Sequence, residues 1–104
     1  MRMTLISEGQ VATPMASAYL GRLCKHFAKK IPAVWNDWGG VAEFPFGRCE
    51  LEADARMLRF RCAAPDDDAM ARLQSVISDH VGMFTKRDPL RVRWTRAVPA
   101  AEEG

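Results

Sequence analysis

The chain has 104 residues and a formal net charge of +2, with 48% hydrophobic and 27% charged residues. Both fractions are close to globular averages, so disorder over the whole chain is excluded and a single domain over residues 1–104 is expected. No apolar run reaches the ~18 residues of a membrane-spanning helix. The first ten residues lack an apolar signal segment, and three cysteines is an odd number, so we expect a cytoplasmic protein with free thiols.

The N-terminal part predicts an edge strand and then a helix. After residues 1–4, which we expect to be frayed, residues 5–12 contain enough apolar side chains for a short strand. Thr13-Pro14 is typical of a helix start, because threonine caps the first turn and proline suits the first helical position. The helix should run over residues 14–30 and end at Ile31-Pro32. Its apolar residues recur at helical spacing: Ala16, Leu20, Leu23, Cys24, Phe27 and Ile31.

The middle of the chain predicts a run of short strands. Residues 33–38 and 41–45 flank Gly39-Gly40, which is a two-residue hairpin signal. Residues 48–53 and 57–63 alternate apolar and charged side chains, as strands with one buried face do. The residues between these two strands, Asp54-Ala55-Arg56, predict a turn.

A second helix and a last strand should complete the fold. Pro65 precedes three aspartates, which favour a helix start because carboxylates cap the first turn and suit the positive end of the helix dipole. The helix should end at Phe84 or Thr85. Residues 90–95 predict a strand, and residues 97–104 are expected to fray. The inward face of the helix should be Ala69, Leu73, Val76, Ile77, His80 and Phe84.

These elements predict an α+β fold, a two-layer sandwich. The expected order is strand, helix, three or four strands, helix, strand. The sheet of five to six strands should be mostly antiparallel, with both helices on one face.

Three motifs carry a resemblance to a known family. They are Leu23-Cys24-Lys25-His26-Phe27, the segment EFPFGRCEL at residues 43–51, and His80 followed by Phe84 and Val92-Arg93-Trp94. Over residues 13–96 the chain resembles domain-of-unknown-function family 2218, a bacterial family of small proteins. The resemblance implies no established activity. It implies a link to iron or siderophore metabolism, because members often lie near iron-uptake proteins.

Our leading interpretation is a non-catalytic accessory module that binds a small molecule or a protein. The segment of residues 43–49 mixes aromatic, glycine and cysteine residues at a strand junction, where a pocket has room to open. The expected ligand-binding residues are His26, Phe44, Phe46, Gly47, Cys49 and His80. No G-x-S-x-G, Walker or H-E-x-x-H motif is present, so the sequence favours a non-enzyme and names no catalytic residue.

The first alternative is a metal, haem or thiol site built from Cys24, Cys49 and His80. Thiolates and imidazole are ligands of zinc, iron and haem, and the pattern places these side chains and Cys62 on the core side. Buried cysteine also packs as a small hydrophobe, and no pair has Cys-x-x-Cys spacing. Cys24 and His26 are two apart on a helix and cannot bind one ion together. The sequence names no cofactor.

The second alternative is nucleic-acid binding, because clustered cations are typical of such proteins. Acidic residues at positions 43, 50 and 52 should pair with the arginines of the open sheet face, and the total charge is near neutral, so nucleic acid is not expected. The sheet-face arginines are Arg48, Arg59, Arg61, Arg91 and Arg93, and the first helix adds Arg22, Lys25, Lys29 and Lys30.

Two tryptophans leave a homodimer open. Trp35 and Trp38 are three apart in a predicted strand and should face opposite sides, so one must leave the helix-covered core. An exposed tryptophan often marks a ligand groove or a subunit contact.

Overall fold

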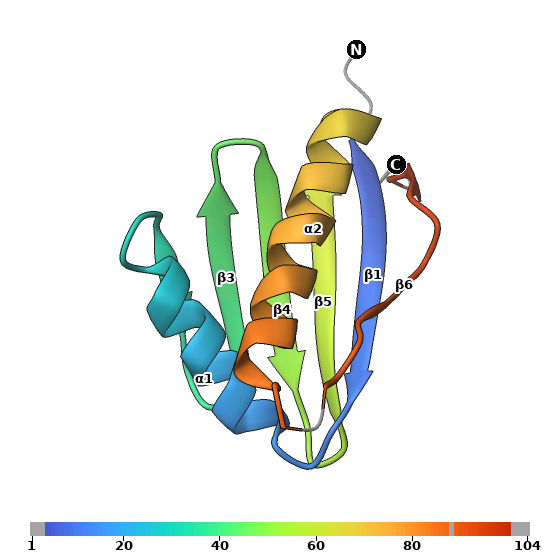
Figure 1. The fold of residues 1–104 in the computed structure, drawn as a ribbon. Helices are drawn as coiled ribbons and strands as arrows, with labels where there is room; N and C mark the ends of the chain where they lie inside the picture. Colours follow the sequence, from blue (N-terminus) through green and yellow to red (C-terminus); the bar gives the residue numbers. More distant parts are fainter. Residues whose placement is uncertain (1–3, 88, 101–104) are drawn as a thin grey trace.

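The computed structural model describes residues 4–87 and 89–100, and it confirms the α+β fold with both helices on one face of an antiparallel sheet (Figure 1). The sheet order is β2-β3-β4-β5-β1-β6, and β7 also pairs with β1. Every strand pair in the described ranges is antiparallel. The elements are β1 (Leu5–Ala12), α1 (Ala16–Phe27), β2 (Ala33–Trp35), β3 (Gly39–Phe44), β4 (Gly47–Ala53), β5 (Met57–Ala64), α2 (Asp67–Phe84), β6 (Arg93–Trp94) and β7 (Val98–Pro99).

The alternation of β4 and β5 produces the centre of the core. Cys49 lies opposite Cys62 and Leu51 lies opposite Phe60, and all four side chains are buried under the helices. The charged residues between them point to the helix-free face. The two-residue period of a strand therefore gives the sheet one buried apolar face under the helices and one charged face, as the sequence predicts.

The two helices begin and end close to the expected positions. In α2, the Asp66 side chain accepts the N–H of Ala69 at 2.8 Å, which confirms the expected aspartate cap. Helix α1 begins at Ala16 rather than at Pro14, because Thr13 Oγ1 accepts the Met15 N–H in a turn before the helix. It ends at Phe27, and residues 28–30 form a turn rather than helix.

The connection between β2 and β3 differs from the predicted two-residue hairpin. Strand β2 stops at Trp35, and Asn36 Oδ1 accepts the N–H groups of Trp38 and Gly39 at 2.9 Å. The glycines instead begin β3. A side chain at Gly40 would come within 3.0 Å of Cys24 Sγ, so the second glycine allows α1 to pack closely on this strand.

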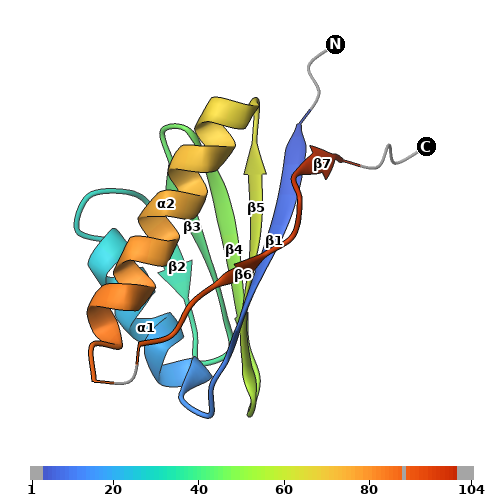
Figure 2. The ribbon, with the colours of Figure 1, turned by 45° about the vertical axis from the view of Figure 1, so that its right-hand side comes forward.

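The expectation that residues 5–12 form an edge strand is wrong. Strand β1 pairs with β5 on one side and with β6 and β7 on the other. The C-terminal segment runs alongside β1 (Figure 2). Val98 and Pro99, within the segment expected to fray, are instead paired in β7, and residues 101–104 lie outside the described ranges.

The last strand is shorter than the predicted 90–95, since only Arg93 and Trp94 pair with β1. The Trp94 indole lies 6.1 Å from the Phe60 ring, between centroids, and its Nε1–H donates to Ser78 Oγ at 2.9 Å. This side chain connects the C-terminal segment to both the sheet and α2.

No helix in residues 4–87 or 89–100 combines the length and the apolar character that crossing a membrane requires.

Candidate functional site

Six aromatic side chains meet where the two helices pack beside β3, and we call them the imidazole–phenyl cluster. The His26 and His80 rings lie 4.7 Å apart between centroids, at an interplanar angle of 59°. Phe27 is 5.2 Å from His80 and 5.1 Å from Phe44. The members are His26 and Phe27 of α1, Phe44 of β3, Phe46 of the β3–β4 turn, and His80 and Phe84 of α2.

The tautomer of the neutral His80 ring follows from one hydrogen bond. Its Nδ1 lies 2.7 Å from the Val76 carbonyl oxygen, one helical turn earlier. A carbonyl only accepts, so Nδ1 carries the proton and, in the neutral ring, Nε2 keeps a lone pair. Helix α2 therefore presents a hydrogen-bond acceptor, or a metal ligand, on a fixed ring.

His26 is half-buried, and its surroundings disfavour the charged ring. Desolvation, the neighbouring His80, and the ammonium groups of Lys29 and Lys30 lower the pKa of His26 below its ordinary value. These surroundings favour the neutral His26 ring, which lies beside His80 without the repulsion of two cations.

The structure brings together four of the six residues predicted to bind a ligand, namely His26, Phe44, Phe46 and His80. Cys49 instead is fully buried in the sheet. Gly47 lies where two neighbouring strands come close together. A side chain at Gly47 would come within 2.7 Å of the Ala63 carbonyl oxygen, so glycine permits the close approach of β4 to β5.

Sequence reasoning missed two phenyl rings of the cluster. Phe27 and Phe84 have the helical spacing of core residues, and the sequence assigned them only to packing. Phe84 is four residues after His80, a spacing at which helical side chains are neighbours, and this could have linked the two. The Arg22 guanidinium carbon also lies over the Phe84 ring, 5.9 Å from the ring centroid.

The three cysteines are free thiols with no exposed surface. Burial raises the pKa of Cys24 to about 11. The pKa of Cys49 is raised by a hydrogen bond with Cys62 and by burial. A buried thiol with a raised pKa is a poor nucleophile. Within the described ranges, no group of three His, Cys, Asp or Glu side chains is placed to hold a metal ion, including the set Cys24, Cys49 and His80.

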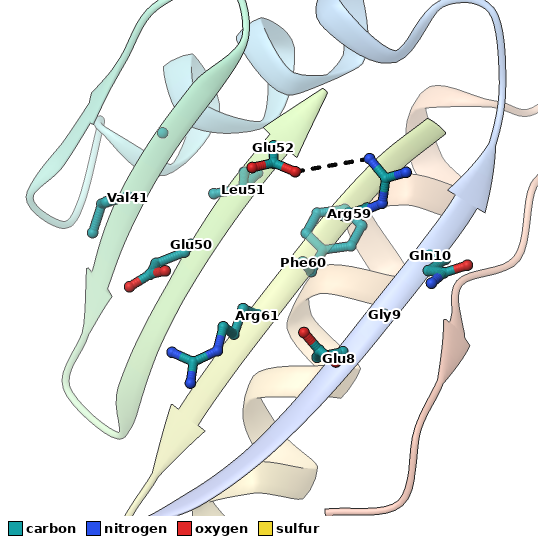
Figure 3. Close-up of a pocket in the computed structure, with 11 residues that line it drawn as sticks. Glu8, Gly9, Gln10, Val41, Glu50, Leu51, Glu52, Arg59, Phe60 and Arg61 are labelled. Atoms are coloured by element: carbon teal, nitrogen blue, oxygen red, sulfur yellow. Dashed lines mark ion pairs between the residues drawn. The ribbon is translucent and has the colours of Figure 1, made fainter. Parts of the chain in front are cut away.

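A shallow hollow of about 440 Å³ lies on the helix-free face of the sheet. Figure 3 shows this face, with the charged side chains of β1, β4 and β5 around the hollow and the helices behind the strands. The polar side chains that line it are Glu8, Gln10, Glu50, Glu52, Arg59 and Arg61.

Ion pairs join many of the charges on this face. Arg59 Nη1 lies 2.7 Å from Asp54 Oδ2 and 3.8 Å from Glu52 Oε1. Arg48 Nε lies 3.4 Å from Glu43 Oε1, and Arg48 Nη2 lies 3.7 Å from Glu50 Oε2. The arginines therefore belong to a surface of mixed sign rather than a positive one, and such exposed pairs contribute little to stability.

The edge of the sheet at β2 exposes apolar side chains. Trp35, at the end of β2, is 41% exposed, and Trp38 is 57% exposed. Trp38 lies in the turn, so the expectation that the two face opposite sides of one strand is wrong. The dimer contact expected here stays a prediction.

Two helices on one face of an antiparallel sheet, with an imidazole–phenyl cluster between them and β3, define a two-layer α+β domain. The chain belongs to a bacterial family described as "Uncharacterized protein conserved in bacteria (DUF2218)", whose model matches residues 8–95. This range contains the whole cluster and confirms the family resemblance.

The fold is also similar to a solved structure, "NMR structure of PA4090 from Pseudomonas aeruginosa". The two chains share 30% sequence identity with a TM-score of 0.74, over 88% of this chain and 95% of that one. No curated protein matches the sequence. These likenesses establish the family and the fold, and they assign no activity.

Proposed function

We propose that the protein is a non-catalytic binding module whose ligand contacts the imidazole–phenyl cluster. The observation that carries the proposal is the pairing of His26 and His80, half-buried rings from different helices whose centroids are 4.7 Å apart. Phenyl rings from three segments surround the pair. Apolar walls with a few convergent polar groups are the usual composition of a ligand site.

The chemistry of the cluster favours an aromatic ligand that carries a hydroxyl group. A neutral imidazole nitrogen accepts an O–H hydrogen bond, and the edges and faces of phenyl rings accommodate a further ring. The hollow on the open sheet face is the weaker candidate, because the Arg59 guanidinium there is already paired with carboxylates.

The proposed cellular role is supported by the family resemblance and by the free thiols. The resemblance to the bacterial family supports an accessory role in iron or siderophore metabolism. Free buried cysteines suit a reducing compartment, so we place the protein in the cytoplasm.

Phenol is a minimal probe for such a ligand, and the test is a titration followed by NMR. We expect saturable shifts of the aromatic ¹H–¹³C signals of His26, His80 and Phe44. The substitution His80→Phe keeps a ring in place and removes the acceptor, so it should weaken phenol binding by about tenfold. Arg61→Gln in the hollow is the matched control and should leave binding unchanged.

Two results would overturn the proposal. One is the absence of saturable shifts at millimolar phenol. The other is a set of shifts centred on Glu8 and Arg61, which would place the ligand in the sheet-face hollow instead.

A further inference from the structure

We propose that His26 and His80 together bind one divalent transition-metal ion. The inference rests on the proposed location of the binding site, and it names an ion that the site would take. It differs from the set Cys24, Cys49 and His80, because it uses two half-buried imidazoles and no buried thiol.

The spacing of the rings fits two ligands in adjacent positions on one ion. A metal–nitrogen bond of ~2.1 Å places the ion ~3.2 Å from the centre of an imidazole ring, so ligand angles of ~90–110° separate two ring centres by ~4.5–5.2 Å. The observed separation of the His26 and His80 centroids is 4.7 Å. The distance between the two ring centres is therefore the one expected for two imidazoles on one ion.

The hydrogen bond of His80 is an independent observation that points the same way. Imidazoles that bind metals usually donate their other N–H to a carbonyl or carboxylate, which orients the ring. His80 Nδ1 is 2.7 Å from the Val76 carbonyl oxygen, and this leaves Nε2 for the ion. The contact lies within one turn of α2, so the ring is oriented before any ligand arrives.

The environment of the pair determines the kind of ion and the number of open positions. Imidazole suits zinc, copper and nickel, whereas magnesium and calcium prefer oxygen ligands. Within the described ranges no third His, Cys, Asp or Glu completes the set. Two or more coordination positions therefore remain for water, or for donor atoms of a second molecule such as an anionic chelating group.

The test is calorimetry with Zn²⁺ on tag-free protein, together with the visible absorption spectrum of the Co²⁺ form. The chain contains only two histidines, so no other imidazole competes. We expect one equivalent of metal, and a loss of affinity of about tenfold or more in each of His26→Ala and His80→Ala. Ser75→Ala, at an exposed and uncharged position of α2, is the matched control and should bind as the wild type does. Mg²⁺ should give no saturable heat.

His26→Gln and His80→Gln, checked by circular dichroism, repeat the measurement with less change in side-chain volume. The proposal is overturned if Zn²⁺ does not saturate the wild type, or if every histidine variant keeps the wild-type affinity. Intense near-ultraviolet absorption of the Co²⁺ form would assign the ion to thiolates and would also overturn it. If phenol still binds when metal does not, only the metal inference fails; if neither binds, the proposed site fails too.

Discussion

At the scale of single residues, burial decides what the cysteines can do. Cys49 and Cys62 lie opposite each other on neighbouring strands, and Cys24 packs on the same face from α1. A thiol must lose its proton to act as a nucleophile, and a dry environment disfavours the resulting thiolate. These residues behave as small apolar side chains of the core.

We therefore predict that no cysteine reacts with Ellman's reagent in the folded protein at pH 8. A thiol of pKa 11, as for Cys24, is only about one part in a thousand thiolate at that pH, and it is also shielded from the reagent. All three thiols should react in guanidinium chloride. Ser75→Cys, at an exposed position of α2, is the control and should release one rapid equivalent. A rapid equivalent from the wild type would contradict the prediction and favour a thiol site.

At the scale of elements, one glycine allows the C-terminal segment to cross β1. A methyl group added at Gly9 would lie 2.6 Å from Val92 Cγ1 and 2.8 Å from the Trp94 ring. The absence of a side chain at Gly9 lets both apolar residues pack over the strand. The sheet thereby gains β6, and Ser7 Oγ donates to the Thr95 carbonyl oxygen at 2.7 Å.

We predict opposite effects for two glycine-to-alanine substitutions. Gly9→Ala should lower the free energy of unfolding by about 1–3 kcal/mol, because the new methyl group has no room. Gly21→Ala should raise it by about 0.5–1 kcal/mol, because the site lies within α1 with open space around it and alanine favours the helix. Urea unfolding followed by tryptophan fluorescence measures both. Equal effects of the two substitutions would show that crowding at Gly9 is unimportant.

At the scale of the whole molecule, the two edges of the sheet differ. The β2 edge is short and exposes Val34, Trp35 and Trp38. At the other edge, β6 and β7 cover β1, so a strand of eight residues is protected from pairing with other chains. The C-terminal segment thus contributes to stability and also closes an edge that would favour aggregation.

We predict that a chain shortened after Arg87 is less stable by about 3 kcal/mol or more, because it lacks the Trp94 side chain that packs on Phe60. It should also self-associate, because β1 becomes an edge. A chain shortened after Ala97 keeps β6 and Trp94, and it should remain within about 1 kcal/mol of the full chain and be monodisperse. Urea unfolding and size-exclusion chromatography test both chains. Equal urea midpoints for all three chains would contradict this role of the segment.

Local patterns predicted the candidate site only in part. Phe44 and Phe46 were predicted because their segment mixes aromatic, glycine and cysteine residues at a strand junction, and His26 and His80 were predicted to border the same surface. That the two imidazoles meet could not be predicted, since the residues are 54 positions apart in sequence (His26 to His80) and their contact depends on how α1 and α2 cross. Cys49 was also predicted to bind a ligand, but its side chain is fully buried and has no exposed surface.

The sequence by itself determined the class of fold, the alternating faces of β4 and β5, and the aspartate cap of α2. These features depend on periodicity and on contacts between near neighbours, which are visible in a short stretch of residues. Only the tertiary structure decided that β1 is interior, that Val98–Pro99 forms β7, and which side chains share the imidazole–phenyl cluster. Pairing at a sheet edge and packing between helices join residues from opposite ends of the chain, and no local pattern specifies such partners.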